Sequence, residues 1–418
     1  MERVAWVLVP PRGEAMHSQM PAALHTICGK TLLKHTIDAM QEAGLTPTLI
    51  ADEEAGAMPE GLPCVMMQKS DADPNGDEAL IEWIRQLGTH SGCVVFARAD
   101  MPLITEQSLR ALIHAVETEN CAAAVLGEAA DGVYCMDMDA LRLALTRPCA
   151  GEAMERFPAE AVRALASAGY TVRTLAQREK DECLRVTNRA TLAKATEHMR
   201  SRINEKLMEN GVTLIDPQRV YADCDVNVGC DTVIYPGCIL ENGTVIGAGC
   251  TLYANCRLNH AKIGDGVTIE SSVILDASVA DHTTVGPYAY IRPNTSVGEG
   301  CRIGDFVELK NSHIGNGTKV SHLTYVGDSD LGEKINLGCG VVFVNYDGKK
   351  KQRSTVGDHA FIGCNVNLVA PVHVGKDAYI AAGSTVTCDV PEGALLVARE
   401  REAIKEGWVA ARKESGKL

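Results

Sequence analysis

The sequence predicts a two-domain protein, with an α/β domain in the first half of the chain and a parallel β-helix in the second half. The chain has 418 residues, enough for two or three domains of roughly 100–200 residues each. The first half alternates short apolar runs with helical patterns. From about residue 214, a hydrophobic residue followed by glycine recurs, in many places at a spacing of six or a multiple of six.

The first half contains the elements of a sheet covered by helices. Its apolar runs include residues 2–9 (ERVAWVLV) and 92–100 (GCVVFARAD), and its helical patterns include residues 29–44 (GKTLLKHTIDAMQEAG). Alternating strand and helix units are typical of a parallel sheet with helices on both faces. Asp100 comes at the end of one strand, where open α/β sheets collect ligand groups.

The second half has the period of a parallel β-helix. A six-residue repeat with one branched aliphatic residue matches neither the 3.6-residue period of a helix nor the two-residue alternation of an ordinary strand. In a β-helix each hexad is one short strand and a turn, three hexads complete a coil, and aliphatic side chains stack inward. Cysteine fills the small position after glycine as a compact hydrophobe. The Gly-Cys pairs end at Cys230, Cys238, Cys250, Cys301, Cys339 and Cys364.

Between the halves, residues 190–210 read as a charged helix that ends at Gly211. This helix would act as a semi-rigid linker between the domains. We therefore divide the chain into a first domain at 1–189, a linker helix at 190–213, a β-helix at 214–390 and a C-terminal tail at 391–418.

The repeat is interrupted conspicuously once, at residues 341–355 (VVFVNYDGKKKQRST). This polar stretch carries Lys349, Lys350, Lys351 and Arg353 between two intact hexads, so we expect it to project as a loop. Loops held on rigid scaffolds commonly carry function. Function is therefore favoured here over a merely solvated basic hairpin.

Charge and cysteine spacing exclude several classes of protein. The 40 Lys plus Arg against 54 Asp plus Glu give a net charge of −14, which argues against a nucleic-acid or membrane-surface partner. No apolar run approaches the roughly 20 residues of a membrane span, and the N-terminus lacks the apolar core of a signal peptide, so a cytoplasmic protein is expected. No CxxC pair is present, so zinc-ribbon and iron–sulfur sites are not expected.

Four strings closely resemble those of the bacterial bifunctional N-acetylglucosamine-1-phosphate uridylyltransferase / glucosamine-1-phosphate N-acetyltransferase family. They are residues 291–312 (IRPNTSVGEGCRIGDFVELKNS), 321–340 (SHLTYVGDSDLGEKINLGCG), 344–351 (VNYDGKKK) and 405–408 (KEGW). The resemblance implies a Rossmann-like, nucleotidyltransferase-type domain followed by a left-handed β-helix of hexapeptide repeats, assembled as a homotrimer. It also implies acetyl-CoA-dependent N-acetylation of glucosamine-1-phosphate in the biosynthesis of UDP-N-acetylglucosamine, a peptidoglycan precursor.

The resemblance implies a catalytic base at His322, with Glu308 orienting it. A histidine suits the removal of a proton from an amine at cytosolic pH while the C–N bond forms. Fixed cations and a hydroxyl donor are suited to hold the phosphate dianion of the sugar. The implied contacts to sugar and phosphate are Arg292, Lys310, Tyr325, Asn336, Asn345, Tyr346 and Lys351.

The acetyl-CoA contacts that the resemblance implies are Cys339, Cys364, Ala382, Arg399 and Lys405, so the C-terminal tail would contribute to this site. Cys339 stands where the family usually has alanine, and Cys364 where it usually has serine. A thiol donates a weaker hydrogen bond than a hydroxyl, so the substitution at Cys364 is the more consequential one.

The first domain departs from the family where nucleotide phosphates bind. The family motif Leu-Ala-Ala-Gly-x-Gly-Thr-Arg-Met aligns with residues 8–16 (LVPPRGEAM). Proline has no N–H to donate to a phosphate, and Glu14 adds negative charge. The arginine of the motif is replaced by Ala15, and a later lysine by Ala22. We therefore expect no useful uridylyl transfer.

Other family positions of the first domain are partly retained. Gln68 matches a uracil contact, but a Gly-Thr-Gly-His-Ala block has become residues 74–78 (PNGDE). Asp100 matches a Mg²⁺ ligand. Its partner asparagine, in a Gly-Val-Asn-Asn/Asp-Arg motif, aligns with Thr187, although Asn188 could take its register. Mg²⁺ is therefore expected only if this domain is active.

Two alternatives to an acetyltransferase stay open from the sequence. A fully bifunctional enzyme, which also transfers UMP from UTP to N-acetylglucosamine-1-phosphate, requires the altered phosphate loop to work. A non-catalytic trimeric scaffold requires His322 and Asn345 to be coincidental. A zinc carbonic anhydrase, a related β-helix class, would need three ligating histidines, and His313, His322, His359 and His373 do not show that spacing.

Overall fold

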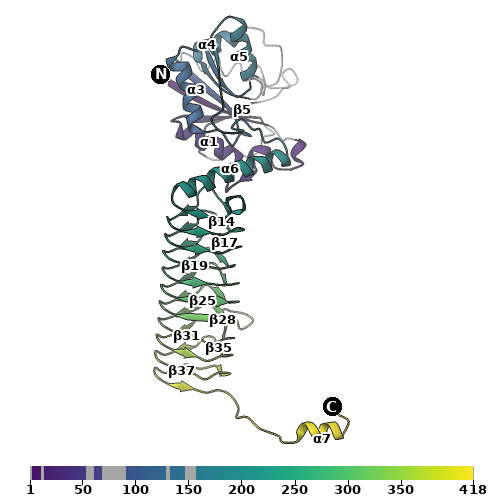
Figure 1. Cartoon of the computed structure of the whole chain (residues 1–418), viewed down its shortest axis with the longest axis vertical. Coiled ribbons are helices and arrows are strands. Elements are labelled where there is room, and N and C mark those ends of the chain that lie inside the picture. The colour runs from purple at the N-terminus through teal and green to yellow at the C-terminus, as the bar shows by residue number, and fades with distance from the viewer. Residues whose placement is uncertain are drawn as a thin grey trace. The chain divides into compact units, whose positions relative to one another are not determined.

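The computed structural model describes residues 2–10, 14–52, 61–67, 91–128, 132–145 and 157–417. The chain divides into two compact units, residues 1–203 and 204–418. Figure 1 shows strands and helices in the N-terminal unit, and a stack of short strands in the C-terminal unit. Within the described ranges, no helix is long and apolar enough to cross a membrane.

The N-terminal unit contains a seven-stranded sheet in the order β5-β4-β1-β6-β8-β7-β9. Its strands run parallel except for β8, which is antiparallel to both β6 and β7. This differs from the parallel sheet that the sequence predicted, because β7 and β8 are joined by a short connection, which makes neighbouring strands antiparallel. The strands are β1 (Glu2–Val9), β4 (Thr46–Asp52), β5 (Cys64–Met67), β6 (Gly92–Arg98), β7 (Ala123–Leu126), β8 (Val133–Asp137) and β9 (Val172–Leu175).

Helices cover both faces of this sheet, as the sequence predicted. Side chains alternate along β1, so that Val7 packs in the core formed with α1 and α3, and Trp6 in the core formed with α4 and α5. Helices α1 and α3 are capped by Thr31 and Thr105, whose side chains accept a backbone N–H three residues on. These helices are α1 (Leu32–Glu42), α3 (Glu106–Thr118), α4 (Met138–Leu145) and α5 (Phe157–Ser167).

A 21-residue helix, α6 (Arg189–Glu209), lies where the sequence predicted a charged helix. Its start is capped by Asn188, whose side-chain oxygen accepts the N–H of Thr191 at 2.9 Å. The division between the two units falls inside this helix, at Asn204. The amide of Asn204 donates to two backbone carbonyls at the start of the β-helix, at 2.7 and 3.0 Å.

The C-terminal unit is a left-handed parallel β-helix with three parallel sheets of 11, 10 and 9 strands (Figure 1). It runs from β10 (Thr213–Leu214) to β39 (Leu395–Leu396), and each strand pairs with the equivalent strand of the next coil. Each coil of the 11-stranded sheet up to β37 (Tyr379–Ile380) buries one aliphatic side chain. These are Leu214, Ile234, Leu252, Ile269, Val285, Ile303, Val320, Leu337, Ile362 and Ile380.

The later coils contain most of the positions singled out in the sequence. Their strands include β23 (Tyr290–Ile291), β25 (Arg302–Asp305), β26 (Glu308–Lys310), β28 (Lys319–His322), β29 (Tyr325–Gly327), β31 (Asn336–Leu337), β32 (Val342–Val344), β33 (Ser354–Val356) and β34 (Phe361–Ile362).

The packing predicted for the Gly-Cys pairs is confirmed for half of them. The Cys301 thiol, for example, is buried against the carbonyl of Gly315 at 3.2 Å, and burial raises its pKa. Such a thiol is an inert packing group. The buried members are Cys238, Cys250 and Cys301, whereas Cys230, Cys339 and Cys364 are exposed or partly exposed.

Replacing Ile303 tests whether the inward stack stabilises the β-helix. Ile303 is fully buried, whereas Ile239 in β14 (Ile239–Glu241) is 37% exposed. We expect Ile303→Ala to lower the free energy of unfolding by about 2–5 kcal/mol, and Ile239→Ala by less than about half as much, because its side chain is already partly in water. Urea denaturation followed by circular dichroism measures both losses, and equal losses would contradict the prediction.

Candidate active site

Five residues that lie far apart in the sequence share one corner of the β-helix in successive coils. We name Asp305, His322, Cys339, Cys364 and Ala382 the corner column. The carbonyl oxygens of the first four accept hydrogen bonds from the backbone of the following coil at 2.8 to 3.4 Å. Cys339, Cys364 and Ala382, the coil residues expected to bind acetyl-CoA, therefore lie in the same column as His322, the expected base.

His322 is oriented by a carboxylate one coil earlier. Its Nδ1 lies 2.5 Å from Oδ1 of Asp305, and this hydrogen bond lowers the pKa of Asp305. If Nδ1 carries the hydrogen donated to Asp305, the lone pair on Nε2 is available to accept a proton. The sequence analysis did not select Asp305. Its signal is its position 17 residues before His322, which is one coil in this repeat.

Glu308, which the resemblance assigned to orienting His322, contacts a different side chain in the single chain. It accepts a hydrogen bond from Nη1 of Arg292 at 2.7 Å, and this raises the pKa of Arg292. The Arg292 guanidinium also lies 5.7 Å from the ring centroid of Tyr290. Glu308 therefore holds a guanidinium in place, and Asp305 is the carboxylate at the histidine.

Four of the side chains expected to bind the sugar phosphate meet around Asp328. Nζ of Lys310 lies 3.7 Å from Oδ2 of Asp328, and the Asn345 amide donates to the same oxygen at 2.5 Å. The Asn345 amide also lies 3.4 Å from the hydroxyl of Tyr325. The neighbouring ammonium of Lys310 lowers the pKa of Lys351. We name these five residues the Asp328 cluster, and its two crowded ammonium groups favour a bound anion.

The loop that interrupts the repeat forms a short hairpin, and its basic residues have different roles. Tyr346 and Lys351 form an antiparallel bridge, and the Asp347 carboxylate accepts two backbone N–H groups at 2.6 and 2.7 Å. Arg353 donates to both carboxylate oxygens of Asp330, at 2.6 Å from its Nε, and so anchors the loop to the coil. In this hairpin, Arg353 therefore has a structural role, whereas Lys351 belongs to the Asp328 cluster.

Besides Arg292 and Tyr346, three expected contacts lie outside these two groups of residues. Asn336 is in β31, Arg399 follows a residue whose N–H donates to the Ser384 hydroxyl at 3.1 Å, and Lys405 is in the exposed segment before α7 (Trp408–Glu414). Over residues 157–417, no side-chain hydrogen bond joins Asn336, Arg399 or Lys405 to the corner column or the Asp328 cluster.

In the N-terminal unit, Asp100 does not fit the Mg²⁺ site that the resemblance implies. Its buried carboxylate pairs with the guanidinium groups of Arg98, at 3.1 Å, and Arg185, at 3.2 Å. Of the residues that the structure describes, none form a group of three or more His, Cys, Asp or Glu side chains that could hold a metal ion. Pro11, Gln68 and residues 74–78 lie outside the described residues.

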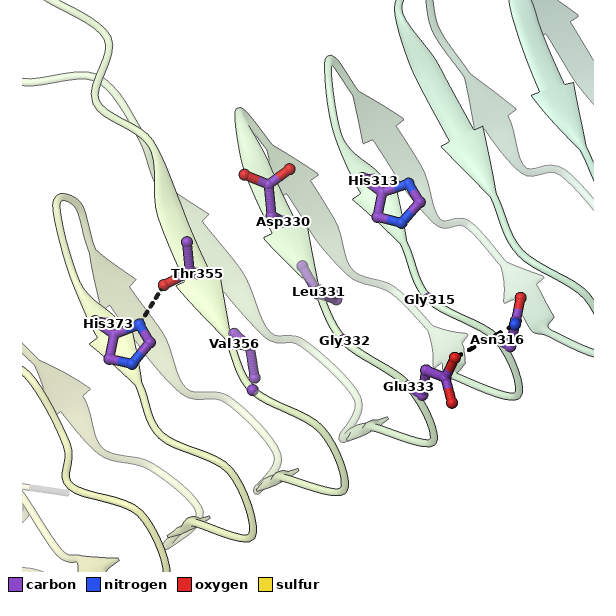
Figure 2. Close-up of a pocket in the computed structure, with 11 residues that line it drawn as sticks. His313, Gly315, Asn316, Asp330, Leu331, Gly332, Glu333, Thr355, Val356 and His373 are labelled. Atoms are coloured by element: carbon purple, nitrogen blue, oxygen red, sulfur yellow. Dashed lines mark hydrogen bonds between the residues drawn. The ribbon is translucent and has the colours of Figure 1, made fainter.

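A groove of about 520 Å³ lies on the nine-stranded sheet, away from the corner column. Figure 2 shows His313, Asp330, Thr355 and His373 on its successive strands. The His373 Nδ1 lies 2.5 Å from the Thr355 hydroxyl, and Asp330 is paired with the arginine of the loop. These side chains are therefore occupied by protein neighbours and do not form the cluster that a zinc enzyme requires.

The chain matches two family models. A model described as a MobA-like NTP transferase domain matches residues 7–168. A model described as a bacterial transferase hexapeptide (six repeats) matches residues 276–311 and 353–388.

Curated relatives named "Bifunctional protein GlmU" match nearly the whole chain. The protein of Clostridioides difficile strain 630 is 38% identical over 444 residues, which cover 97% of each chain. That of Clostridium perfringens strain SM101 is 40% identical over 453 residues, 99% of this chain and 100% of that protein. Among solved structures, Rv0371c of Mycobacterium tuberculosis H37Rv matches 47% of this chain and 97% of that chain, at 18% identity and a TM-score of 0.36.

Asp305→Asn tests whether the carboxylate orients His322. We expect kcat of acetyl transfer to fall about tenfold or more, with each KM within about twofold, because the charge that stabilises a protonated histidine is lost while the Asp328 cluster is untouched. Steady-state kinetics separate the two effects. Asp276→Asn is the matched control, since Asp276 forms a similar pair with His260 at 2.8 Å. An unchanged kcat, or an effect on KM alone, would contradict this role.

Proposed function

The chain belongs to the bifunctional GlmU family, and from this membership we propose that the corner column and the Asp328 cluster together form its working acetyltransferase site. The protein is an enzyme of UDP-N-acetylglucosamine biosynthesis, and its hexapeptide repeats form the acetyltransferase domain. The observation that carries the proposal is the hydrogen bond from His322 to Asp305 in the same coils as a paired set of lysines.

Glucosamine-1-phosphate fits the charges of the Asp328 cluster. Lys310 and Lys351 supply two ammonium groups, and Arg292, held by Glu308, supplies a guanidinium. Hydrogen bonds from such cations to phosphate oxygens are among the strongest in proteins. Because Lys310 lowers the pKa of Lys351, a dianion between the two ammonium groups relieves their repulsion. The buried amide of Asn345 supplies a neutral donor beside them.

In the proposed reaction, the amino nitrogen of the sugar attacks the carbonyl carbon of the acetyl-CoA thioester. Nε2 of His322 takes the proton that the nitrogen loses as the C–N bond forms. The C–S bond then breaks, and the CoA thiolate takes up a proton. The negative charge of Asp305 stabilises the imidazolium formed during the transfer.

We place acetyl-CoA along the corner column on the C-terminal side of the histidine, past Cys339, Cys364 and Ala382. This direction brings the thioester to the base and leaves the remainder of CoA to follow the column. Arg399 and Lys405, in the tail, are cations suited to the phosphates of CoA. Both acetyl-CoA and the sugar phosphate are products of cytosolic metabolism, and we place the enzyme in the cytoplasm.

Two substitutions separate chemistry from binding in this site. His322→Ala should lower kcat by about 10²–10⁴. Lys351→Ala should instead raise KM for glucosamine-1-phosphate by about 10- to 100-fold, through loss of a charged contact worth roughly 1.5–3 kcal/mol. Release of the CoA thiol measures both rates. Lys349→Ala, in the same hairpin, is the matched control and should change little. Near wild-type turnover of the His322 variant at neutral pH would show that the proposed base is wrong.

We also propose that the β-helix assembles as a homotrimer. Phe306 and Leu323 directly follow Asp305 and His322, and with Tyr288 they expose 57 to 61% of their apolar side chains. All three have φ between 46° and 60°, a left-handed conformation that is uncommon for bulky residues. Exposed apolar side chains stacked in this way mark an interface. Subunit contacts at this stripe would bring a neighbouring chain to the acetyl transfer site.

Light scattering tests the trimer. The full chain should have a mass of about three times 44.7 kDa. Phe306→Asn should weaken the assembly without unfolding it, because asparagine tolerates the left-handed conformation. Tyr253→Asn, which changes an exposed aromatic ring in an earlier coil, should leave the mass unchanged. A monodisperse wild-type monomer would overturn the proposal.

For the N-terminal unit we propose that the fold is kept and nucleotidyl transfer is lost. Pro10 and Pro11 remove two backbone donors from the phosphate loop. Ala22 puts a buried methyl group where the resemblance implies a lysine, and Asp100 is paired with arginines. Nucleotidyl transfer rests on positioning and electrostatic stabilisation, so these losses remove the means of catalysis rather than an accessory to it.

The uridylyl half-reaction is tested on the same preparation that acetylates glucosamine-1-phosphate. We expect pyrophosphate release from UTP and N-acetylglucosamine-1-phosphate, with Mg²⁺ present, to be slower than in an active transferase by more than about 10⁵. The acetyl transfer rate is the control for folded protein. Pyrophosphate release at a rate comparable with acetyl transfer would restore the fully bifunctional enzyme, which the matched NTP transferase model and the names of the relatives favour.

A further inference from the structure

The buried carboxylate of Asp100 lies between two guanidinium groups. Its Oδ1 is 3.1 Å from Nε of Arg98, and its Oδ2 is 3.3 Å from Nη2 of Arg98 and 3.2 Å from Nη2 of Arg185. The side chains of Asp100 and Arg98 are 3% and 7% exposed, and that of Arg185 is 25% exposed. Both carboxylate oxygens are therefore occupied by charged donors that are largely shielded from water.

The backbone fixes this arrangement. Arg98 is the last residue of β6, and Asp100 follows two residues later. The N–H of Val186 donates to the backbone carbonyl of Asp100 at 2.8 Å, which holds the neighbouring Arg185 beside the carboxylate. Val186 is itself fully buried. The ion pair with Arg98 is therefore buried, and the pair with Arg185 lies at the edge of the buried region, because a quarter of the Arg185 side chain is exposed.

The second metal ligand implied by the resemblance is an asparagine, which is not present at the aligned position. Thr187 stands there, and its backbone N–H donates to the hydroxyl of Thr191 at 3.0 Å. Asn188, the alternative in the next register, accepts the N–H of Thr191 with its side-chain oxygen and so caps α6. The glycine of the same family motif aligns with Arg185, so one substitution removes a small residue and adds a cation next to Asp100.

We propose that the cluster of Arg98, Asp100 and Arg185 has replaced the divalent-cation site of this domain, so that the N-terminal unit does not bind Mg²⁺. The two guanidinium groups carry the formal charge of the ion, and arginine stays protonated in proteins. A divalent ion would have to take both oxygens of Asp100 from these donors and then lie beside two like charges. Mg²⁺ usually binds through one or two carboxylates together with waters and substrate phosphates, and the carboxylate of Asp100 is already paired with arginines.

Mn²⁺ binding to the full-length protein, measured by electron paramagnetic resonance of the free ion, tests this inference. Wild type and Asp100→Asn should bind the same amount of Mn²⁺. Arg98→Ala with Arg185→Gly frees the carboxylate and should raise Mn²⁺ affinity by at least about tenfold. Adding Asp100→Asn to those two changes should remove the gain. Mn²⁺ binding that depends on Asp100 in the wild type, or no gain after both arginines are removed, would overturn the inference.

A second measurement on the wild-type protein decides the matter if the variants do not fold. Bound Mn²⁺ broadens the NMR signals of nearby amides, so the amides of Asp100 and Val186 should keep their line widths as Mn²⁺ is added. Selective broadening at these two residues would overturn the inference.

This inference deepens the proposed loss of uridylyl transfer, and the two fail in different experiments. Mn²⁺ at Asp100 in a protein without uridylyl transfer would overturn the cation replacement and leave the proposed function standing. Uridylyl transfer without metal binding at Asp100 would do the reverse.

Discussion

The register of the stacked coils is the constraint on which the rest of the structure depends. Strand pairing between coils places residues such as Asp305 and His322, 17 positions apart, or Val233 and Thr251, 18 positions apart, as neighbours, at roughly the 4.8 Å spacing of adjacent strands. The buried aliphatic stack stabilises this register, since a slip would expose it. The register brings Asp305 beside His322 and Lys310 beside Asp328. The position of the site is therefore determined by the repeat and by the places where polar residues interrupt it.

The two units differ in how the charges of their polar clusters are balanced. In the C-terminal unit, Lys310 pairs with Asp328 and lies beside Lys351, so the cluster keeps an excess of positive charge that an anionic substrate can neutralise. In the N-terminal unit, the buried carboxylate of Asp100 is shared by two arginines. There the carboxylate that a metal ion would need is already paired with the two guanidinium groups. These ion pairs stabilise the fold and do not bind a ligand.

Periodicity predicted the fold well, because a six-residue repeat with inward aliphatic residues has few other solutions. It could not predict that β8 runs antiparallel, which depends on one short connection. The resemblance selected Lys310, Tyr325, Asn345 and Lys351 but not Asp328, around which they meet, and it assigned the orientation of His322 to Glu308. Asp305 was missed because its role comes from being one coil away, a relation visible only when strands are paired. The role of Arg185 was missed because its contact with Asp100 joins segments 85 residues apart, and that of Arg98, two residues from Asp100, because the sequence does not show which way the two side chains turn.

A crystal structure of the protein with glucosamine-1-phosphate and CoA tests the central claim most directly. The account predicts the amino nitrogen of the sugar within about 3 Å of Nε2 of His322, the phosphate between Lys310 and Lys351, and CoA along the corner column. It also predicts that Nδ1 of His322 stays bonded to Asp305. A sugar phosphate bound away from both lysines, or a histidine that leaves Asp305 when substrate binds, would contradict it.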